Sequence, residues 1–292
     1  MTPTVQPPLR LLRPPYRRLH QLSGSRSELK QFGREPGSAL VWSPPTRRIA
    51  PTHLDYVRGR PGGLALILVL PPAEQLPEPA DLLRMVEESR PASILPHLPD
   101  LEPEELTQLL RRPPRDLPVQ VSEYLRWRGI RADRETVQLI RRVVELSAEL
   151  RSVAALARGL YLSRRALGRR FMTRGLPVPS HWLHFSRLLR VVIRLQGTDD
   201  TVVAAGYRLG YGDGFALSNQ MVRLTGVRPS QARERLGWEW FMEAWLRQEA
   251  EDGSLRPELL GAREITAATA VESQGSGEDR VDPEGTGLEA AS

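Results

Sequence analysis

Two short segments carry the side chains whose chemistry is most informative. In residues 163–171, Leu167 and Phe171 repeat at helical spacing and should face inward, and in residues 214–223 Leu217 and Met221 do the same. The side chains left on the outer faces are Arg164, Arg165, Gly168, Arg169, Phe215, Ala216, Asn219 and Arg223. Arginine can donate two hydrogen bonds to guanine, and asparagine can pair in the same way with adenine. This chemistry favours recognition of a nucleic acid.

Each of these segments follows a shorter apolar segment and a tight turn, so that residues 152–171 and 201–221 form two similar units. Ala157 and Gly206 are small enough for two helices to cross closely at their positions. Gly210 suits a turn that needs a positive φ angle, whereas the first unit has Tyr161 there, so we expect that turn to be built differently. The expected N-caps of the second helices are Ser163 and Asp213. The pattern is typical of a helix-turn-helix, whose second helix enters the major groove of DNA.

A long apolar stripe connects the two units. Residues 180–195 place Trp182, Phe185, Leu188, Leu189, Val192 and Leu195 at helical spacing. A helix of that length measures roughly 24 Å. It can hold two reading helices near the ~34 Å repeat of one DNA turn, so one chain could read successive major grooves without forming a dimer.

Two such motifs joined by one long helix resemble the AraC/XylS family of bacterial transcription regulators, over about residues 133–236. The second motif of that family usually reads A-x-x-x-G-F-x-D, then a helix, then G-x-x-P-S-x-x-R. Here residues 206–213 read Gly-Tyr-Arg-Leu-Gly-Tyr-Gly-Asp, and residues 226–233 read Gly-Val-Arg-Pro-Ser-Gln-Ala-Arg. The resemblance implies that Arg165, Gly168, Arg169, Phe215, Ala216 and Asn219 face the bases. It leaves Arg164, Arg170, Arg223 and Arg228 as phosphate binders or salt-bridge partners, and for Phe215 packing inside the motif stays an open alternative.

The positive charge of the chain is concentrated where these motifs lie. The whole chain has a net charge of +6. Residues 151–236 contain 15 arginines and four acidic residues, a net charge of +11, whereas residues 237–292 contain four arginines and 13 acidic residues, a net charge of −9. Arginine is preferred throughout, since Lys30 is the single lysine, but that preference would not place the excess in one segment. The natural partner of such a segment is a polyanion.

Other kinds of chemistry find little support. With no cysteine there is no disulfide, thiol nucleophile or thiolate zinc site, and no apolar run reaches the ~20 residues that span a bilayer. His181 and His184 lie three residues apart, but a metal site needs further ligands, so we expect interface histidines and neither metal nor cofactor. Asp199 and Asp200 precede the second motif, where N-capping and stabilisation of the helix dipole explain them better than acid/base catalysis. We expect a cytoplasmic protein that is not an enzyme.

The first half of the chain predicts a small α/β domain. Residues 1–38, rich in proline, arginine, serine and glycine, are expected to form a disordered basic arm. Residues 39–130 contain strand candidates at 39–42, 63–70 and 92–95 and helix candidates at 80–88 and 103–110, an alternation that indicates a parallel sheet of few strands. The arrangement loosely resembles a degenerate receiver domain. Because the strongest strand ends in Leu70-Pro71-Pro72 where a receiver has its phosphoacceptor aspartate, we do not expect phosphorylation.

The rest of the chain is expected to be helical up to an acidic tail, so the fold class is mainly α. Further helices are predicted at 117–129 and 134–148, and at 237–247, where three tryptophans should pack against the preceding unit. Residues 131–249 then form the DNA-binding domain. Residues 250–292, acidic and poor in large apolar groups, are expected to be disordered.

The leading hypothesis is a sequence-specific, DNA-binding transcription regulator that reads two half-sites with two helix-turn-helix motifs. Its partner would be double-stranded DNA, with RNA polymerase as a further candidate and no membrane. The alternative is a non-enzymatic adaptor whose α/β domain binds a protein and whose motifs dock on DNA without sequence preference.

Overall fold

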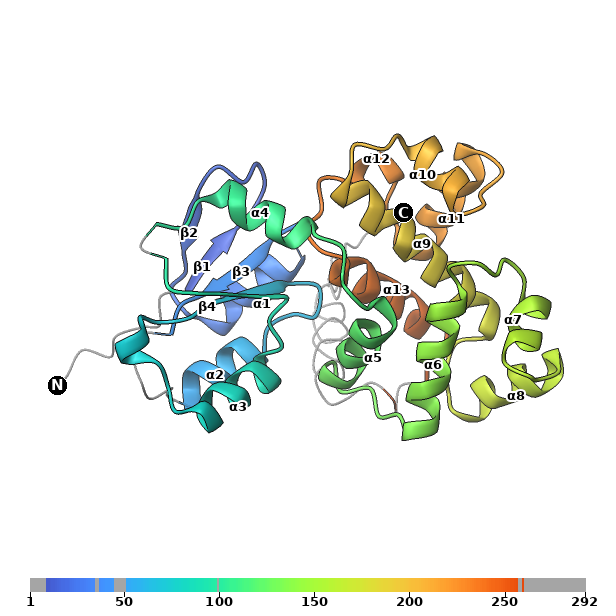
Figure 1. Cartoon of the computed structure of the whole chain (residues 1–292), viewed down its shortest axis with the longest axis horizontal. Helices are drawn as coiled ribbons and strands as arrows, with labels where there is room; N and C mark the ends of the chain where they lie inside the picture. The colour runs from blue at the N-terminus through green and yellow to red at the C-terminus, as the bar shows by residue number, and fades with distance from the viewer. Residues whose placement is uncertain (1–8, 35–36, 45–50, 99, 257–258, 260–292) are drawn as a thin grey trace, which may run out of the picture.

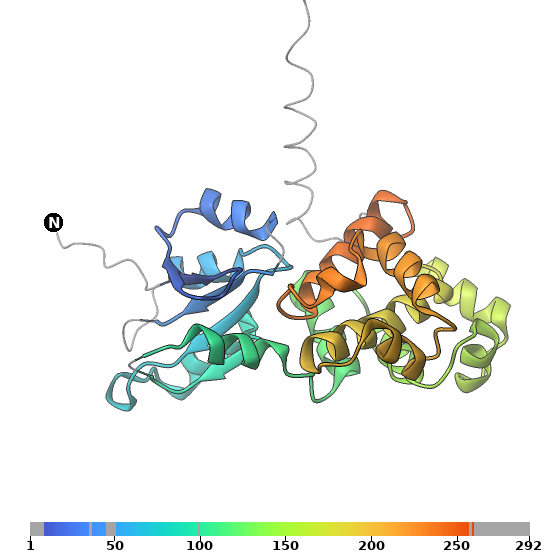
Figure 2. The ribbon, with the colours of Figure 1, turned by 90° about the horizontal axis from the view of Figure 1, so that it is seen from above.

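The computed structural model describes residues 9–34, 37–44, 51–98, 100–256 and 259. These residues form two units that lie side by side, a sheet covered by helices and an all-helical unit (Figure 1, Figure 2). Helices dominate the described chain. The expected fold class, mainly α with a small α/β unit before a helical helix-turn-helix unit, is confirmed.

The sheet has five strands among the described residues, in the order β2-β1-β3-β4-β5. β3 (Ala39–Trp42), β4 (Ala65–Val69) and β5 (Ser93–Leu95) are parallel, with Leu40 opposite Leu66 and Ile67 opposite Ser93. These are the three strands that the sequence predicts. β1 (Leu9–Leu12) and β2 (Leu19–Gln21) add an antiparallel edge. The sheet is therefore mixed, and the expectation of a parallel sheet is correct only for β3, β4 and β5.

The expectation of a disordered arm over residues 1–38 is wrong for the part that the structure describes. β1 lies between β2 and β3, and its Leu9, Leu11 and Leu12 are fully buried. A helix, α1 (Arg26–Arg34), follows the two strands. Pro14 and Pro15, which suggested disorder, lie in the turn after β1 and do not interrupt the strand. Residues 1–8 and 35–36 lie outside the described residues.

The two faces of the sheet are covered by different elements. Alternate strand residues such as Leu40 and Leu66 pack with α1, α2 (Pro51–Arg58) and α3 (Pro79–Ser89). The other face, which includes Val41 and Ile67, packs against α4 (Pro103–Arg111). α4 and α2–α3 are seen on opposite sides of the sheet (Figure 1). A 3₁₀ turn, Ala73–Gln75, follows β4.

The helical unit contains α5 (Leu117–Trp127), α6 (Arg134–Leu146), α7 (Val153–Gly159), α8 (Arg164–Thr173), α9 (Pro179–Gly197), α10 (Val202–Arg208), α11 (Gly214–Thr225), α12 (Pro229–Ala232) and α13 (Glu239–Glu251). The apolar residues of α5 belong to this helical core, although the boundary was expected after residue 130. The predicted packing of the C-terminal tryptophans is confirmed for Trp245, which stacks on Phe185 of α9 at 4.2 Å between ring centroids and meets Trp182 edge-on.

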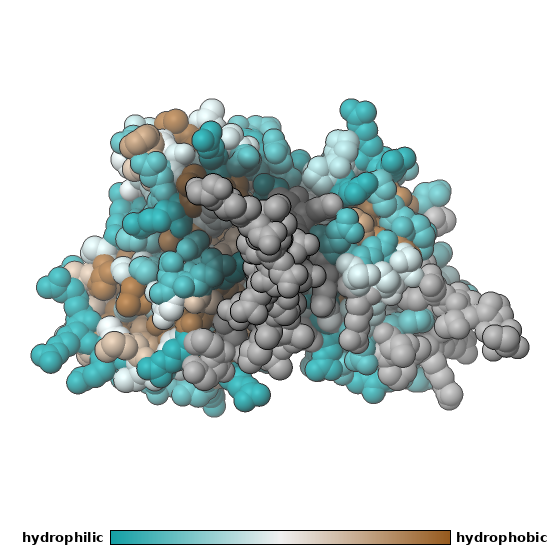
Figure 3. All heavy atoms as spheres, turned by 180° about the vertical axis from the view of Figure 1, so that it is seen from behind, coloured by the Kyte–Doolittle hydropathy of each residue, from teal (hydrophilic) through white to brown (hydrophobic). Residues whose placement is uncertain are grey.

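The structure continues past the point where the acidic tail was expected to begin. α13 extends to Glu251, Leu255 is buried, and the backbone N–H of Arg256 donates to the carbonyl of Gly175 at 3.0 Å. The rest of the predicted tail, residues 257–258 and 260–292, lies outside the described residues. Seen from behind, the surface is largely hydrophilic, and the apolar spheres gather mainly over the helical unit (Figure 3).

The two units share a buried interface. Leu236, in the segment between α12 and α13, is fully buried in the same cluster as Val41, Ile67 and Leu110 of the α/β unit. Nearby, the hydroxyl of Tyr16 donates to the carbonyl of Glu234 at 2.6 Å. The sheet unit therefore contacts the helical unit directly, on the side that carries α12 and α13.

Candidate nucleic-acid interface

The first helix pair consists of α7 and α8. Ser152 and Ser163 cap the two helices, because their hydroxyls accept the N–H groups of Ala155 at 3.2 Å and Ala166 at 3.1 Å. The cap expected at Ser163 is thus confirmed. Leu167 and Phe171 of α8 are fully buried, as their spacing predicts, and Ala157 of α7 lies in the same core.

The second helix pair, α10 and α11, repeats this construction. The hydroxyl of Thr201 accepts the N–H of Ala204 at 3.1 Å, and Asp213 accepts the N–H of Ala216 at 2.6 Å, as expected for its cap. Leu217 and Met221 are fully buried. A Cβ at Gly206 would lie 3.1 Å from Leu217 Cδ2, so the two helices cross as closely as the small residue suggests.

The two turns have the same backbone conformation, which contradicts the expectation that Tyr161 forces a different one. Tyr161 has a φ of 55° and Gly210 a φ of 77°, both in the left-handed region. In each turn the N–H of the residue that follows donates to the carbonyl of the small residue of the first helix, Leu162 to Ala157 at 2.9 Å and Tyr211 to Gly206 at 3.0 Å. The side-chain surroundings differ, because the Tyr161 side chain enters open solvent whereas the Arg151 guanidinium occupies the space beside Gly210.

The side chains predicted to face outward on α8 and α11 do so in the structure. Arg164, Arg165 and Arg169 are exposed on α8, and a Cβ at Gly168 would meet nothing within 4 Å. On α11, Ala216, Asn219 and Arg223 are exposed. Phe215 is 75% exposed, so it does not pack inside the motif, which was the alternative reading of this residue. Figure 1 shows the two pairs at opposite ends of the helical unit with α9 between them.

The arginines of residues 151–236 divide into two groups. Eight have a polar, ionic or ring partner within the described chain: Arg170, Arg174, Arg187, Arg190, Arg194, Arg208, Arg233 and Arg235. The other seven have side chains with no hydrogen bond or ion pair to any residue that the structure describes: Arg151, Arg158, Arg164, Arg165, Arg169, Arg223 and Arg228. The unpartnered group includes all four arginines predicted at the DNA-facing positions.

α6 fixes the position of α8 through ion pairs. The guanidinium of Arg174 donates to Thr136 Oγ1 at 2.7 Å and lies 2.9 Å from Glu135, and Arg170 lies 3.4 Å from the same carboxylate. These contacts hold the side of α8 that does not carry Arg165 and Arg169. Arg170 is therefore a salt-bridge partner, one of the two roles the sequence left open for it.

α9 positions the second pair from within the core. It spans 19 residues, about 28 Å at 1.5 Å per residue, and the apolar stripe predicted on it is buried. Arg187 is buried in this helix, donates to the carbonyl of Leu209 at 2.6 Å and lies over the ring of Tyr211. Burial lowers the pKa of Arg187, which nevertheless stays cationic because guanidinium groups titrate so high. Burial also raises the pKa of Tyr211 to about 12, so its hydroxyl stays protonated.

The acidic and histidine pairs have structural roles. Asp200 forms ion pairs with Arg194 and Arg208, and Thr201 caps α10, so the expected capping by Asp199-Asp200 is wrong. His181 Nδ1 lies 2.8 Å from the buried carboxylate of Glu249, on α13. Among the described residues no group of three or more potential metal ligands occurs, and no described helix is long and apolar enough to cross a membrane.

A buried polar network that the sequence did not reveal joins α5 to α13. Arg128 donates two hydrogen bonds to Glu243, through Nε at 2.7 Å and Nη2 at 2.5 Å, and the Tyr124 hydroxyl donates to the same carboxylate at 2.7 Å. Burial raises the pKa of Glu243, but the hydrogen bonds and charge of Arg128 outweigh it and hold that pKa below its ordinary value. The sequence shows only a distant arginine and glutamate, and no local pattern pairs them.

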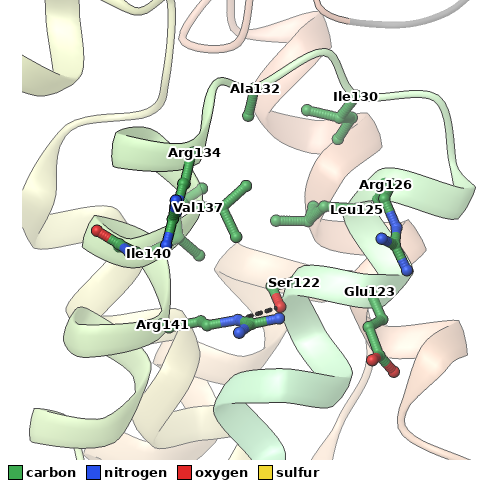
Figure 4. A pocket seen from close by; sticks show the side chains of 11 residues that line it. Ser122, Glu123, Leu125, Arg126, Ile130, Ala132, Arg134, Val137, Ile140 and Arg141 are labelled. Carbon is green, nitrogen blue, oxygen red and sulfur yellow. Dashed lines mark hydrogen bonds between the residues drawn. The ribbon is translucent and has the colours of Figure 1, made fainter.

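A hollow of about 330 Å³ lies between α5 and α6, away from the two helix pairs. Figure 4 shows Leu125 and Val137 pointing into it while Arg141 reaches across to Ser122, whose hydroxyl accepts from Arg141 Nε at 2.7 Å. This hollow contributes none of the outward-facing groups on α8 and α11.

Comparison with known proteins supports the reading of the helix pairs. A family model of a helix-turn-helix domain matches residues 156–235, which extend from α7 to the segment after α12. No curated protein matches the chain. The capped helix pairs, the positive segment and this match together show that residues 156–235 form a helix-turn-helix domain similar to those of AraC-type regulators.

Proposed function

We propose that this protein is a sequence-specific transcription regulator that places α8 and α11 in successive major grooves of one DNA site. The observation that carries the proposal is the pair of outward faces at the two ends of α9. On each of them the arginines predicted to contact DNA have no partner within the described chain. An unpaired guanidinium on a helix held rigidly from behind can bind a base edge without first breaking an internal ion pair.

The length of α9 supports a bipartite site. At about 28 Å it approaches the ~34 Å that separates equivalent points on successive turns of the major groove. One chain would then cover both half-sites. Inserting five base pairs between the half-sites turns one by about half a helical turn, so high-affinity binding should be lost, whereas ten base pairs restore the facing but not the distance.

Base reading by α8 is tested with Arg169→Ala. Bound sequences are first selected from a random duplex library with the full chain, and affinities are then measured by fluorescence anisotropy on the selected duplex and on a random one. Loss of a bidentate contact should cost about 1–3 kcal/mol on the selected duplex and much less on the random one. Equal losses on both would show that Arg169 contacts only the backbone.

Arg115→Ala is the matched control, because Arg115 is exposed before α5 and has no hydrogen bond or ion pair with the described residues. It should leave both affinities unchanged. If selection enriches no sequence and binding depends on salt alone, the protein is instead an adaptor that docks on DNA without sequence preference. That outcome would refute the proposed function.

A further inference from the structure

The outward faces of α8 and α11, which are proposed to contact the bases, differ in chemistry. In the first two turns of α8 the outward side chains are Arg164, Arg165 and Arg169, all cationic and unpartnered. In the first two turns of α11 they are Phe215, Ala216 and Asn219, with no charged group, and Arg223 follows one turn later. Two helices built alike therefore present opposite kinds of contact to the groove.

Guanine and thymine show a matching difference in the groups that they expose in the major groove. Guanine offers N7 and O6, which a guanidinium can bind together, whereas thymine offers a C5-methyl group that suits an apolar side chain. Adenine offers N7 and an amino group, which match the two ends of an asparagine amide. The face of α8 is thus complementary to guanine and the face of α11 to thymine and adenine.

Gly168 adds an independent observation on α8. A glycine inside a helix costs about 0.5–1 kcal/mol relative to alanine. A Cβ at Gly168 would meet nothing within 4 Å, so packing inside the protein does not require the glycine. It lies between Arg165 and Arg169 on the outward side, where the absence of a side chain lets the helix backbone approach a groove closely.

We infer, on the basis of the proposed function, that the operator is chemically asymmetric: α8 binds a half-site read through guanines, and α11 binds a half-site read through thymine methyls and adenine. Arg165 and Arg169, four residues apart, rise about 6 Å along the helix, close to two base-pair steps. Two guanines about two steps apart are expected under α8. Phe215 and Asn219 have the same separation, so a thymine and an adenine are expected at a similar distance under α11.

Base analogues test this inference at single atoms. The full chain is titrated with selected duplexes in which 7-deazaguanine replaces guanine, which removes N7, or uracil replaces thymine, which removes the methyl. The first change should weaken binding about tenfold for the native protein and have little effect on Arg169→Ala. The second should weaken binding severalfold for the native protein and have little effect on Phe215→Ala.

The substituted side chains are exposed, so the variants should fold, and their circular dichroism and unfolding midpoints check this. Gly168→Ala gives a separate reading, since it should raise the unfolding midpoint while weakening binding to the guanine half-site. Selection that enriches two half-sites of the same composition, or analogue effects that Arg169→Ala and Phe215→Ala leave unchanged, would overturn the asymmetry and leave the proposed function intact. Selection that enriches no sequence would overturn both.

Discussion

Replacing Tyr161 by glycine should stabilise the protein. Tyr161 has a φ of 55°. The left-handed region lowers the stability of the folded state by about 1–2 kcal/mol for an L-residue, and glycine is free of this strain. Against this, glycine has more conformational freedom in the unfolded chain, which lowers the free energy of unfolding by about 0.4–1 kcal/mol. The ring is 96% exposed, so its removal uncovers no apolar surface. The difference leaves a net stabilisation of about 0.5–1 kcal/mol.

Urea unfolding followed by tryptophan fluorescence measures the change, with equal slopes required for the comparison. Tyr161→Ala is the control, since it removes the ring but keeps a Cβ at the same φ, and it should leave the free energy of unfolding within a few tenths of a kcal/mol of the native value. If Tyr161→Gly destabilises the protein, or if Tyr161→Ala stabilises it as much, the strain assigned to this turn does not exist.

Three further changes follow from the same contacts. Gly210→Ala should destabilise by more than about 1 kcal/mol in urea, because the left-handed turn is strained by a Cβ that also displaces the Arg151 guanidinium; an unchanged midpoint would contradict this. Glu243→Leu should cost about 3–5 kcal/mol, as it removes the buried carboxylate that Arg128 binds, and a cost below 1 kcal/mol would show the pair to be dispensable. Because the pKa of Glu243 is held below its ordinary value, the stability it provides is present above about pH 4.3 and lost as the pH falls through the lower folded-state pKa. The stability gap between native protein and Glu243→Gln should therefore narrow from pH 5 to 3, and a constant gap would refute the assignment. Leu236→Ala should lower the unfolding free energy by about 2–5 kcal/mol in a single transition seen by every probe; a separate early transition of one unit would contradict the shared core.

Most of the helices and the three parallel strands were predictable because their signals are local. Proline at the first position of α4 and the apolar run of β4 identify those elements without knowledge of their neighbours. β1 was not predictable in the same way, because a four-residue strand between proline pairs is recognised only by the strands that it joins. α2 was missed for a similar reason, since its residues give a weak helical pattern and lie next to a proline-rich segment.

For the candidate interface, spacing alone identified which side chains face outward, and the structure places Arg165, Arg169 and Asn219 there. Spacing could not show which arginines already form ion pairs within the protein. Arg170 and Arg174 are as basic as their neighbours, and their pairing with Glu135 depends on how α6 lies against α8. The conformation of Tyr161 was misjudged because residue preference favours glycine there, whereas the surrounding hydrogen bonds impose the turn on either residue.

Leu236 limits how such a protein can be rearranged by recombination. A leucine from the segment after α12 completes the core of the sheet, so the helical half is not a unit that can be fused unchanged to another N-terminal domain. A transplanted helical half would carry an uncovered leucine, and the sheet left behind would lack one wall of its interior. Inheritance of the two halves as one piece is therefore favoured, and chimaeras should keep residues 234–237 together with the sheet that they complete.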